Sequence, residues 1–229
     1  MFKRGSPSRV FPSKSSSRTS SEKKICPDLA HLRGVSRGMR DAVDATGRRI
    51  KELDEYTALD LGYVTTLRCL QRRGRLSRKE FLCHAAARSG QLEELKALRA
   101  ESCPWTVYTC QAAATGGHLE VLQWARANGC TWNKHTCAVA AEGGHLNVLQ
   151  WARENGCPWD EETCTGAAKS GHLEVLQWAR LNGCPWGEST CDGAVVGGHL
   201  KLMLWAHANG CPWKGGRARN WRQRTDTLR

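Results

Sequence analysis

The 229-residue chain lacks any apolar run near the roughly 20 residues that cross a membrane, and it lacks the apolar core of a secretory signal. Phenylalanine and tyrosine are scarce, with three of each, whereas tryptophan occurs ten times. The sequence contains no phosphate-binding glycine loop, no convincing carboxylate pair and no nucleophile outside the repeated motifs described below. We therefore expect a protein without a membrane span, catalytic residues or a cofactor.

Acidic residues are few at both ends of the chain. Residues 1–40 hold ten Lys or Arg against two acids, residues 214–229 hold six against one, and residues 41–213 hold eighteen against nineteen. The formal net charge of +12 therefore belongs to the ends. We expect residues 1–25 and 214–229 to be disordered basic tails, the first rich in serine, with an electrostatic attraction for nucleic acid.

The chain carries twelve cysteines, which in the absence of a secretory signal favours a reducing compartment and free thiols. We expect a cytoplasmic or nuclear protein. Organelle targeting stays open, because a Ser-, Arg- and Lys-rich N-terminus without an acid before Glu22 is also typical of a transit peptide.

The body of the chain repeats one phrase. Gly117–Cys130 reads GHLEVLQWARANGC, and near-copies begin at Gly144, Gly171 and Gly198, each 27 residues after the last. Self-similarity at a fixed period of this length indicates a stacked repeat architecture.

A full unit, Thr136–Glu162, contains Thr-Cys, a run of small residues, Gly-His, an apolar-periodic stretch, Asn-Gly-Cys-Pro-Trp and three variable residues. Leu82–Trp105 and Ala58–Gly74 are weaker copies. Residues 51–213 therefore hold about six units, and degenerate outer units are expected because one of their faces has no neighbour.

Each unit is predicted to be two short helices joined by a glycine turn. In the second helix one face is apolar (Val121, Leu122, Trp124, Ala125) and the other polar (Glu120, Gln123, Arg126). Gly129 follows where a helix C-terminus favours a left-handed residue. Neither helix reaches the roughly 12–15 residues at which isolated helices become marginally stable, so a unit must bury its apolar face on its neighbours.

This pattern resembles the ankyrin repeat. Ala113-Ala114, Gly117-His118, Leu119–Leu122 and Gly129-Cys130 match the family motif in order. An ankyrin unit has about 33 residues, and the shortfall here falls after Trp132, at the position of the family's β-hairpin finger. The resemblance implies an all-α, ankyrin-like helical repeat solenoid with shortened or absent β-hairpin fingers, most simply a monomer that binds a protein partner.

Cysteine, histidine and tryptophan recur in every full unit. Cys110 and His118 could form a catalytic or thiol metal site, but the same pair recurs in every full unit, which favours a packing role. We expect Cys110 and Cys130 to be buried, His118 to bond a loop carbonyl and Trp124 to lie in the core. Trp132 is expected to pack under the bend, with an exposed aromatic row as the alternative.

Some positions vary between units while the frame repeats. A fixed frame with variable surface positions is how a solenoid builds a recognition face. The variable residues of the bends and first helices are the predicted partner-binding residues; the alternative is that they are simply solvated (Tyr108, Gln111, Thr115, Lys134, His135, Glu142, Glu161, Glu162, Lys169, Glu188).

Residues 26–50 precede the solenoid and contain an amphipathic helical pattern that suits a capping helix. The stretch also resembles the second half of an F-box, without the first half. That resemblance implies remnant F-box helices and a Skp-type adaptor as partner, held by their apolar residues (Leu29, Leu32, Val35, Met39, Val43).

The sequence thus predicts a non-catalytic protein–protein interaction scaffold, and with a working F-box a substrate receptor of a ubiquitin ligase. The first alternative is nucleic-acid binding through the basic tails and Arg72–Lys79. The second is a thiol metal-binding protein.

Overall fold

The computed structural model describes residues 53–213. The two basic tails, residues 1–25 and 214–229, lie outside the described residues. So do the F-box-like segment 26–50 and its proposed adaptor-binding side chains (Leu29, Leu32, Val35, Met39, Val43).

Residues 53–213 form α-helices only, arranged as consecutive pairs, and no strand occurs among them. The expected loss of the β-hairpin finger is therefore confirmed for this part of the chain. The six pairs are α3 (Glu55–Asp60) with α4 (Val64–Arg72), α5 (Glu80–Arg88) with α6 (Leu92–Ala100), α7 (Val107–Thr115) with α8 (Leu119–Ala127), α9 (Lys134–Glu142) with α10 (Leu146–Glu154), α11 (Glu161–Ser170) with α12 (Leu173–Leu181), and α13 (Glu188–Val196) with α14 (Leu200–Ala208).

The even-numbered helix of each unit is amphipathic, as its spacing predicts. In α8, Val121, Leu122 and Ala125 are buried. The helix ends at Ala127 and is capped by Asn128, whose side-chain amide donates to the Trp124 carbonyl at 2.8 Å. Gly129 then takes φ +85°, a left-handed conformation that favours glycine, and turns the chain into the bend.

In four units a histidine ring packs against the turn glycine of the unit before it. Nε2 of His118 lies 3.0 Å from the Arg88 carbonyl oxygen, and Nε2 of His145 lies 3.0 Å from the Thr115 carbonyl oxygen. The His145 ring also occupies the space beside Gly117, where a Cβ would come within 2.5 Å of its Nδ1. His118 was expected to bond a loop carbonyl; it bonds instead the carbonyl of Arg88, the last residue of α5 in the preceding unit.

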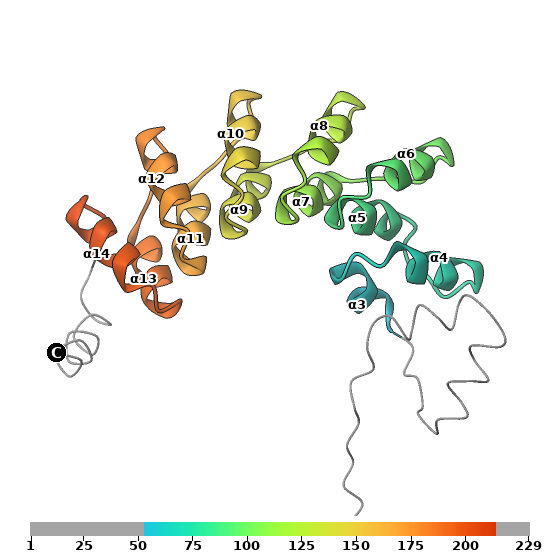
Figure 1. The fold of residues 1–229 in the computed structure, drawn as a ribbon, viewed down its shortest axis with the longest axis horizontal. Helices are drawn as coiled ribbons and strands as arrows, with labels where there is room; N and C mark the ends of the chain where they lie inside the picture. Colours follow the sequence, from blue (N-terminus) through green and yellow to red (C-terminus); the bar gives the residue numbers. More distant parts are fainter. Residues whose placement is uncertain (1–52, 214–229) are drawn as a thin grey trace, which may run out of the picture.

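The helix pairs follow one another in an arc, with odd-numbered helices on its inner side and even-numbered helices fanning apart on its outer side (Figure 1). Small residues allow the inner helices to approach closely: a Cβ on Gly166 would lie 3.1 Å from the Ala138 carbonyl oxygen. The even-numbered helices carry the larger Leu and Trp side chains. We infer that this difference in width produces the curvature.

At the bends between units, where the ankyrin family has its β-hairpin finger, tryptophan and arginine side chains pack together. Trp132 and Trp151 meet edge to face with ring centroids 5.7 Å apart. The Arg126 guanidinium lies over the Trp132 ring, 4.1 Å from its centroid, and donates to the Cys130 carbonyl. Equivalent triplets recur in neighbouring units (Arg99, Trp105, Trp124; Arg153, Trp159, Trp178; Arg180, Trp186, Trp205).

These triplets refine two predictions. Trp124 packs against the core but is only partly buried, rather than lying inside it, because it meets the bend tryptophan of the preceding unit. Arg126 was expected on the polar face, yet it is partly buried over an aromatic ring.

Candidate interaction surface

Each inner helix from α5 to α13 carries three positions at which the residue varies from unit to unit. We call these positions together the inner row. The first position holds Phe81, Tyr108, His135, Glu162 and Ser189; the second holds His84, Gln111, Ala138, Thr165 and Asp192; the third holds Arg88, Thr115, Glu142, Lys169 and Val196. By contrast, the buried positions between them repeat, with Cys110 and its copies fully buried in α7, α9, α11 and α13. The structure therefore combines a constant core with a variable row on the inner side of the arc.

The first half of the inner row contains Phe81, His84 and Tyr108, and Tyr56 of α3 extends this aromatic stretch. Tyr56 of α3 meets Phe81 of α5 with ring centroids 5.8 Å apart. Phe81 lies beside His84 at 6.1 Å, and His84 lies beside Tyr108 of α7 at 6.0 Å. Phe81 and His84 are buried, whereas Tyr56 and Tyr108 remain about 60% exposed. Two tyrosine rings are thus held by buried partners and present a surface that can pack against another molecule.

His84 is the buried titratable group of this aromatic stretch. A ring nitrogen, Nε2, lies 3.1 Å from the Thr106 hydroxyl oxygen. Burial lowers the pKa of His84 to about 4, while the nearby Glu80 carboxylate opposes that shift. The imidazole is therefore neutral at pH 7.

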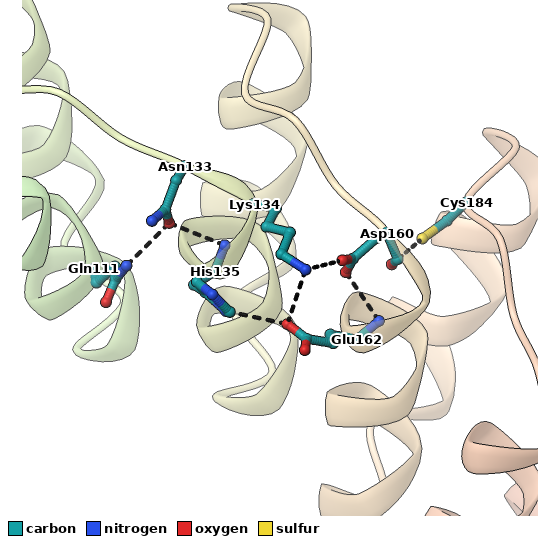
Figure 2. Close-up of polar contacts among 7 residues, drawn as sticks. All are labelled: Gln111, Asn133, Lys134, His135, Asp160, Glu162 and Cys184. Carbon is teal, nitrogen blue, oxygen red and sulfur yellow. Dashed lines mark hydrogen bonds and ion pairs between the residues drawn. The ribbon is translucent and has the colours of Figure 1, made fainter.

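The second half of the inner row is charged, and its centre lies where α9 and α11 begin (Figure 2). Lys134 Nζ lies 2.6 Å from Asp160 Oδ2 and 3.9 Å from Glu162 Oε2. His135 Nδ1 lies 3.1 Å from the same Glu162 oxygen. Three predicted residues are therefore brought together here: Lys134, His135 and Glu162.

Asp160 completes this cluster. Its Oδ1 accepts the Glu162 amide at 3.0 Å, which caps α11. Burial favours a higher pKa for Asp160, but the hydrogen bonds from Lys134 and the Glu162 amide outweigh it and lower the pKa. The bond to Asp160 in turn raises the pKa of Lys134. Both groups are therefore charged at pH 7.

Other predicted residues make further polar contacts. Gln111 Nε2 donates to Asn133 Oδ1 at 3.0 Å, which also accepts the His135 amide at 3.1 Å (Figure 2). The Thr115 hydroxyl donates to the Gln111 carbonyl within its own helix at 2.9 Å. Glu142 and Lys169 face each other across α9 and α11 with 3.8 Å between Oε1 and Nζ.

Two predicted residues lie at the first turns of α11 and α13. Glu161 is exposed, and its Oε2 would come within 2.8 Å of a Cβ on Gly187, the residue that precedes α13. Glu188 is partly buried at the start of α13.

The sequence interpretation missed the capping residues. Asn133 and Asp160 occupy one equivalent position, immediately before α9 and α11. The signal was available, because Asn and Asp are favoured where a helix begins. It also missed the contacts of Tyr56 with Phe81, since the first unit is too degenerate to align its inner helix.

Among the described residues, no group of three or more His, Cys, Asp or Glu side chains is arranged to hold a metal ion. None of the described helices is long and apolar enough to span a membrane.

Comparison with known proteins finds 187 matching chains among solved structures. No protein-family model matches the chain, and no curated protein matches it. The fold is similar to the crystal structure of the human ASB11 ankyrin repeat domain, at 18% sequence identity and a TM-score of 0.48, over 57% of this chain and 69% of that one.

Residues 53–213 form stacked helix pairs with a glycine at positive φ in the turn of each pair. Histidine hydrogen bonds link neighbouring units. These residues form an ankyrin-like helical repeat solenoid. In this solenoid the inner row lies on the side where the helices approach most closely, so side chains of successive units lie next to one another. A partner that spans several units would therefore contact one continuous surface.

Proposed function

We propose that the ankyrin-like solenoid is a protein–protein interaction scaffold whose inner row binds its partner. The observation that carries this proposal is the contrast between units: equivalent inner-row positions hold Tyr108, His135, Glu162 and Ser189, while the core beneath them is constant. The aromatic half offers rings for packing, and the charged half offers directional ion pairs.

Site-specific photo-crosslinking tests this proposal. A photoreactive amino acid would replace Tyr108 or His135 on the inner row, and Glu120 or Glu174 on the outer helices as matched exposed controls. We expect the inner-row probes to label one and the same protein, and the outer probes not to label it. Equal labelling from both surfaces would contradict an inner-row site.

We further propose that this scaffold is a substrate receptor of a ubiquitin ligase, through the F-box-like segment 26–50. The support is the sequence pattern alone, with Leu32 and Val35 on its apolar face. In the full chain, Leu32→Arg and Val35→Arg should abolish co-purification of a Skp-type adaptor, while Arg33→Glu should reduce it less. Co-purification that is unaffected by all three changes, or absent from the unmodified chain, would exclude this role.

Nucleic-acid binding is the second candidate, and an exposed basic loop favours it. Arg72 at the end of α4, and Arg78 and Lys79 just before α5, are exposed at the end of the solenoid that follows the basic N-terminal residues. Binding through phosphates would weaken steeply as salt rises. Titration of a labelled duplex at increasing salt, with Arg72→Gln and Lys79→Gln beside the unmodified chain, separates this function from the inner-row proposal.

A further inference from the structure

The last described unit, α13 with α14, has an apolar surface. Val196 of α13 is 66% exposed, and Leu200 and Leu204 of α14 are 36% and 54% exposed. We call these three side chains the end face. The three preceding units have glutamine at the Leu204 position and other polar residues at the Val196 position (Gln123, Gln150, Gln177; Thr115, Glu142, Lys169).

In the preceding units the corresponding surface meets the next helix pair. The alanines at the Val195 position are buried there, whereas Val195 itself is only partly buried (Ala114, Ala141, Ala168). The turn glycines of those units each face a histidine ring of the next unit, whereas no described atom lies within 4 Å of a Cβ built on Gly198. The end face is therefore a stacking surface whose neighbour is not among the described residues.

An apolar end face is unusual for the last unit of a solenoid. Helices α13 and α14 lie at one end of the arc (Figure 1). An end unit normally presents a polar outer surface, because that surface meets water. Exposed aliphatic side chains on two adjacent helices instead indicate a surface that another segment covers.

Residues 214–224 of the same chain follow the last described bend directly and continue the register of the repeat. One period of 27 residues beyond Cys191 and Ala194 stand Ala218 and Trp221. The Cys191 and Ala194 positions are fully buried in every unit from α7 to α13, so they face neighbours that are already present in the last described unit. The other residues from 219 to 224 are polar, as the outer side of a cap requires (Arg219, Asn220, Arg222, Gln223, Arg224).

An ion pair between neighbouring inner helices shows which residue of this segment would meet the start of α13. Lys134, the first residue of α9, bonds the Asp160 carboxylate 26 residues further along the chain, at 2.6 Å. Glu188 is the first residue of α13, and the same step leads from it to Lys214. The ion pair that joins α9 to α11 would therefore recur with its charges reversed.

A second contact leads to the same register. Thr165 Oγ1 of α11 lies 3.5 Å from Thr190 Oγ1 of α13, 25 residues further along the chain. Asp192 occupies the Thr165 position one unit later, and the same step leads from it to Arg217. Both steps thus pair an acidic side chain of α13 with a basic side chain that follows the last described bend.

We propose that residues 214–224 bind to the end face of their own chain as a further inner helix that caps the solenoid. Trp221 stands where the other units have a buried alanine, which leaves room for an outer helix. In this register the next outer helix would begin only at residue 227, one period after Leu200. The indole ring can therefore occupy that room and cover Leu200 and Leu204.

The apolar contact and the ion pairs have different roles in this cap. Burial of a large apolar side chain contributes more to stability than a partly exposed ion pair does. Leu204 and Trp221 therefore supply most of the binding free energy, whereas the charges of Asp192 and Arg217 fix the alignment. Composition alone predicts a disordered basic tail at this place, because it does not take account of the surface that the tail follows.

Hydrogen exchange of the full chain, followed by mass spectrometry, tests the proposal. We expect the backbone amides of residues 217–224 to exchange at least about tenfold more slowly than those of an unstructured chain, and equally slowly after dilution of the protein. Exchange at the unstructured rate would overturn the cap. Protection that is lost on dilution would also overturn it, because the segment would then bind a second copy instead of its own chain.

Two substitutions test the apolar contact. Leu204→Gln introduces the residue of the three preceding units, so it suits the fold, and Trp221→Gln removes the indole ring. Each should abolish the protection of residues 217–224 while α9 to α12 keep theirs. Arg222→Gln is the matched control, because position 222 lies one period after Val195, on the side away from the solenoid. Equal effects of Arg222→Gln and Trp221→Gln would contradict the assigned face.

A charge reversal tests the register. Asp192→Arg and Arg217→Asp should each lower the protection of residues 217–224, because each places like charges side by side. The double variant restores opposite charges and should regain the protection of the unmodified chain. If the losses of the two single variants simply add in the double variant, the two side chains do not meet and the proposed register is wrong.

Discussion

At the scale of single residues, His145 and His84 illustrate two roles of histidine in this protein. His145 bonds the Thr115 carbonyl of the preceding unit, as His118 bonds the Arg88 carbonyl. His84 instead lies within the inner row, buried between Phe81 and Tyr108. Because these environments differ, His145 is expected to affect the free energy of unfolding, and His84 its dependence on pH.

Replacing His145 with Ala should lower the free energy of unfolding by about 1–3 kcal/mol, because the Thr115 carbonyl loses its partner in a packed site. Urea denaturation measures this loss. His135→Ala is the control, since that side chain is half exposed and its removal should change stability by less than about 0.5 kcal/mol. Equal losses in both variants would show that the hydrogen bond between His145 and the Thr115 carbonyl does not stabilise the fold.

His84 should make stability depend on pH. Burial lowers its folded pKa to about 4, below the ordinary 6.5, so the unfolded chain binds the proton more readily. The stabilisation is complete above pH 6.5 and is lost as pH falls toward 4, by about 3 kcal/mol at most.

Thermal denaturation between pH 7.5 and 4 measures this dependence on His84. His84→Gln places the side chain of Gln111, its equivalent in the next unit, at this position and should flatten the dependence. An unchanged pH profile in that variant would assign the effect to other groups.

At the scale of elements, four consecutive bends are stabilised by an arginine stacked on a tryptophan. The last unit departs from this pattern, because His207 stands where Arg126, Arg153 and Arg180 stand in the units before it. His207 meets Trp213 edge to face with ring centroids 5.7 Å apart. The last described bend therefore lacks the planar cation that covers the others.

Restoring the arginine should stabilise this bend. His207→Arg is expected to raise the free energy of unfolding by about 0.5–1 kcal/mol through stacking on Trp213. The urea midpoint measures the change. His207→Lys supplies the charge without the planar group and should give a smaller gain, so an equal gain in both would attribute the effect to charge alone.

The frame of the solenoid could be predicted from the sequence, because each element has a local signal. Helix periodicity, the glycine after Asn128 and the buried cysteines follow from spacing and repetition. Contacts between units could not be predicted in this way. The partner of Lys134 is Asp160, 26 residues away, and the stacking of Arg126 on Trp132 depends on the path of the bend.

At the scale of the whole molecule, the solenoid is a linear array in which each unit contacts only its neighbours. The inter-unit histidine bonds, the bend triplets and the buried cysteines recur in the same register. Stability should therefore be close to a sum over units and their interfaces.

Removing one complete unit should leave a folded, shorter solenoid. Deletion of residues 136–162 joins His135 to Thr163 and keeps the repeat in register. The slope of the unfolding free energy against urea concentration should fall by about one sixth, because that slope scales with the surface exposed on unfolding. Deletion of residues 136–155 removes a piece of different length and breaks the register. Circular dichroism and urea titration should show cooperative unfolding for the first deletion only.

The glycine at the turn of each unit also bears on how such a chain can lengthen. Gly117, Gly144 and Gly171 each face a histidine ring of the next unit, whereas no described atom lies within 4 Å of a Cβ built on Gly198. A tandem duplication of 27 residues placed there would supply the matching histidine together with its own glycine. Growth by copying therefore requires no compensating mutation, which accounts for why near-identical units stand beside one another in this sequence.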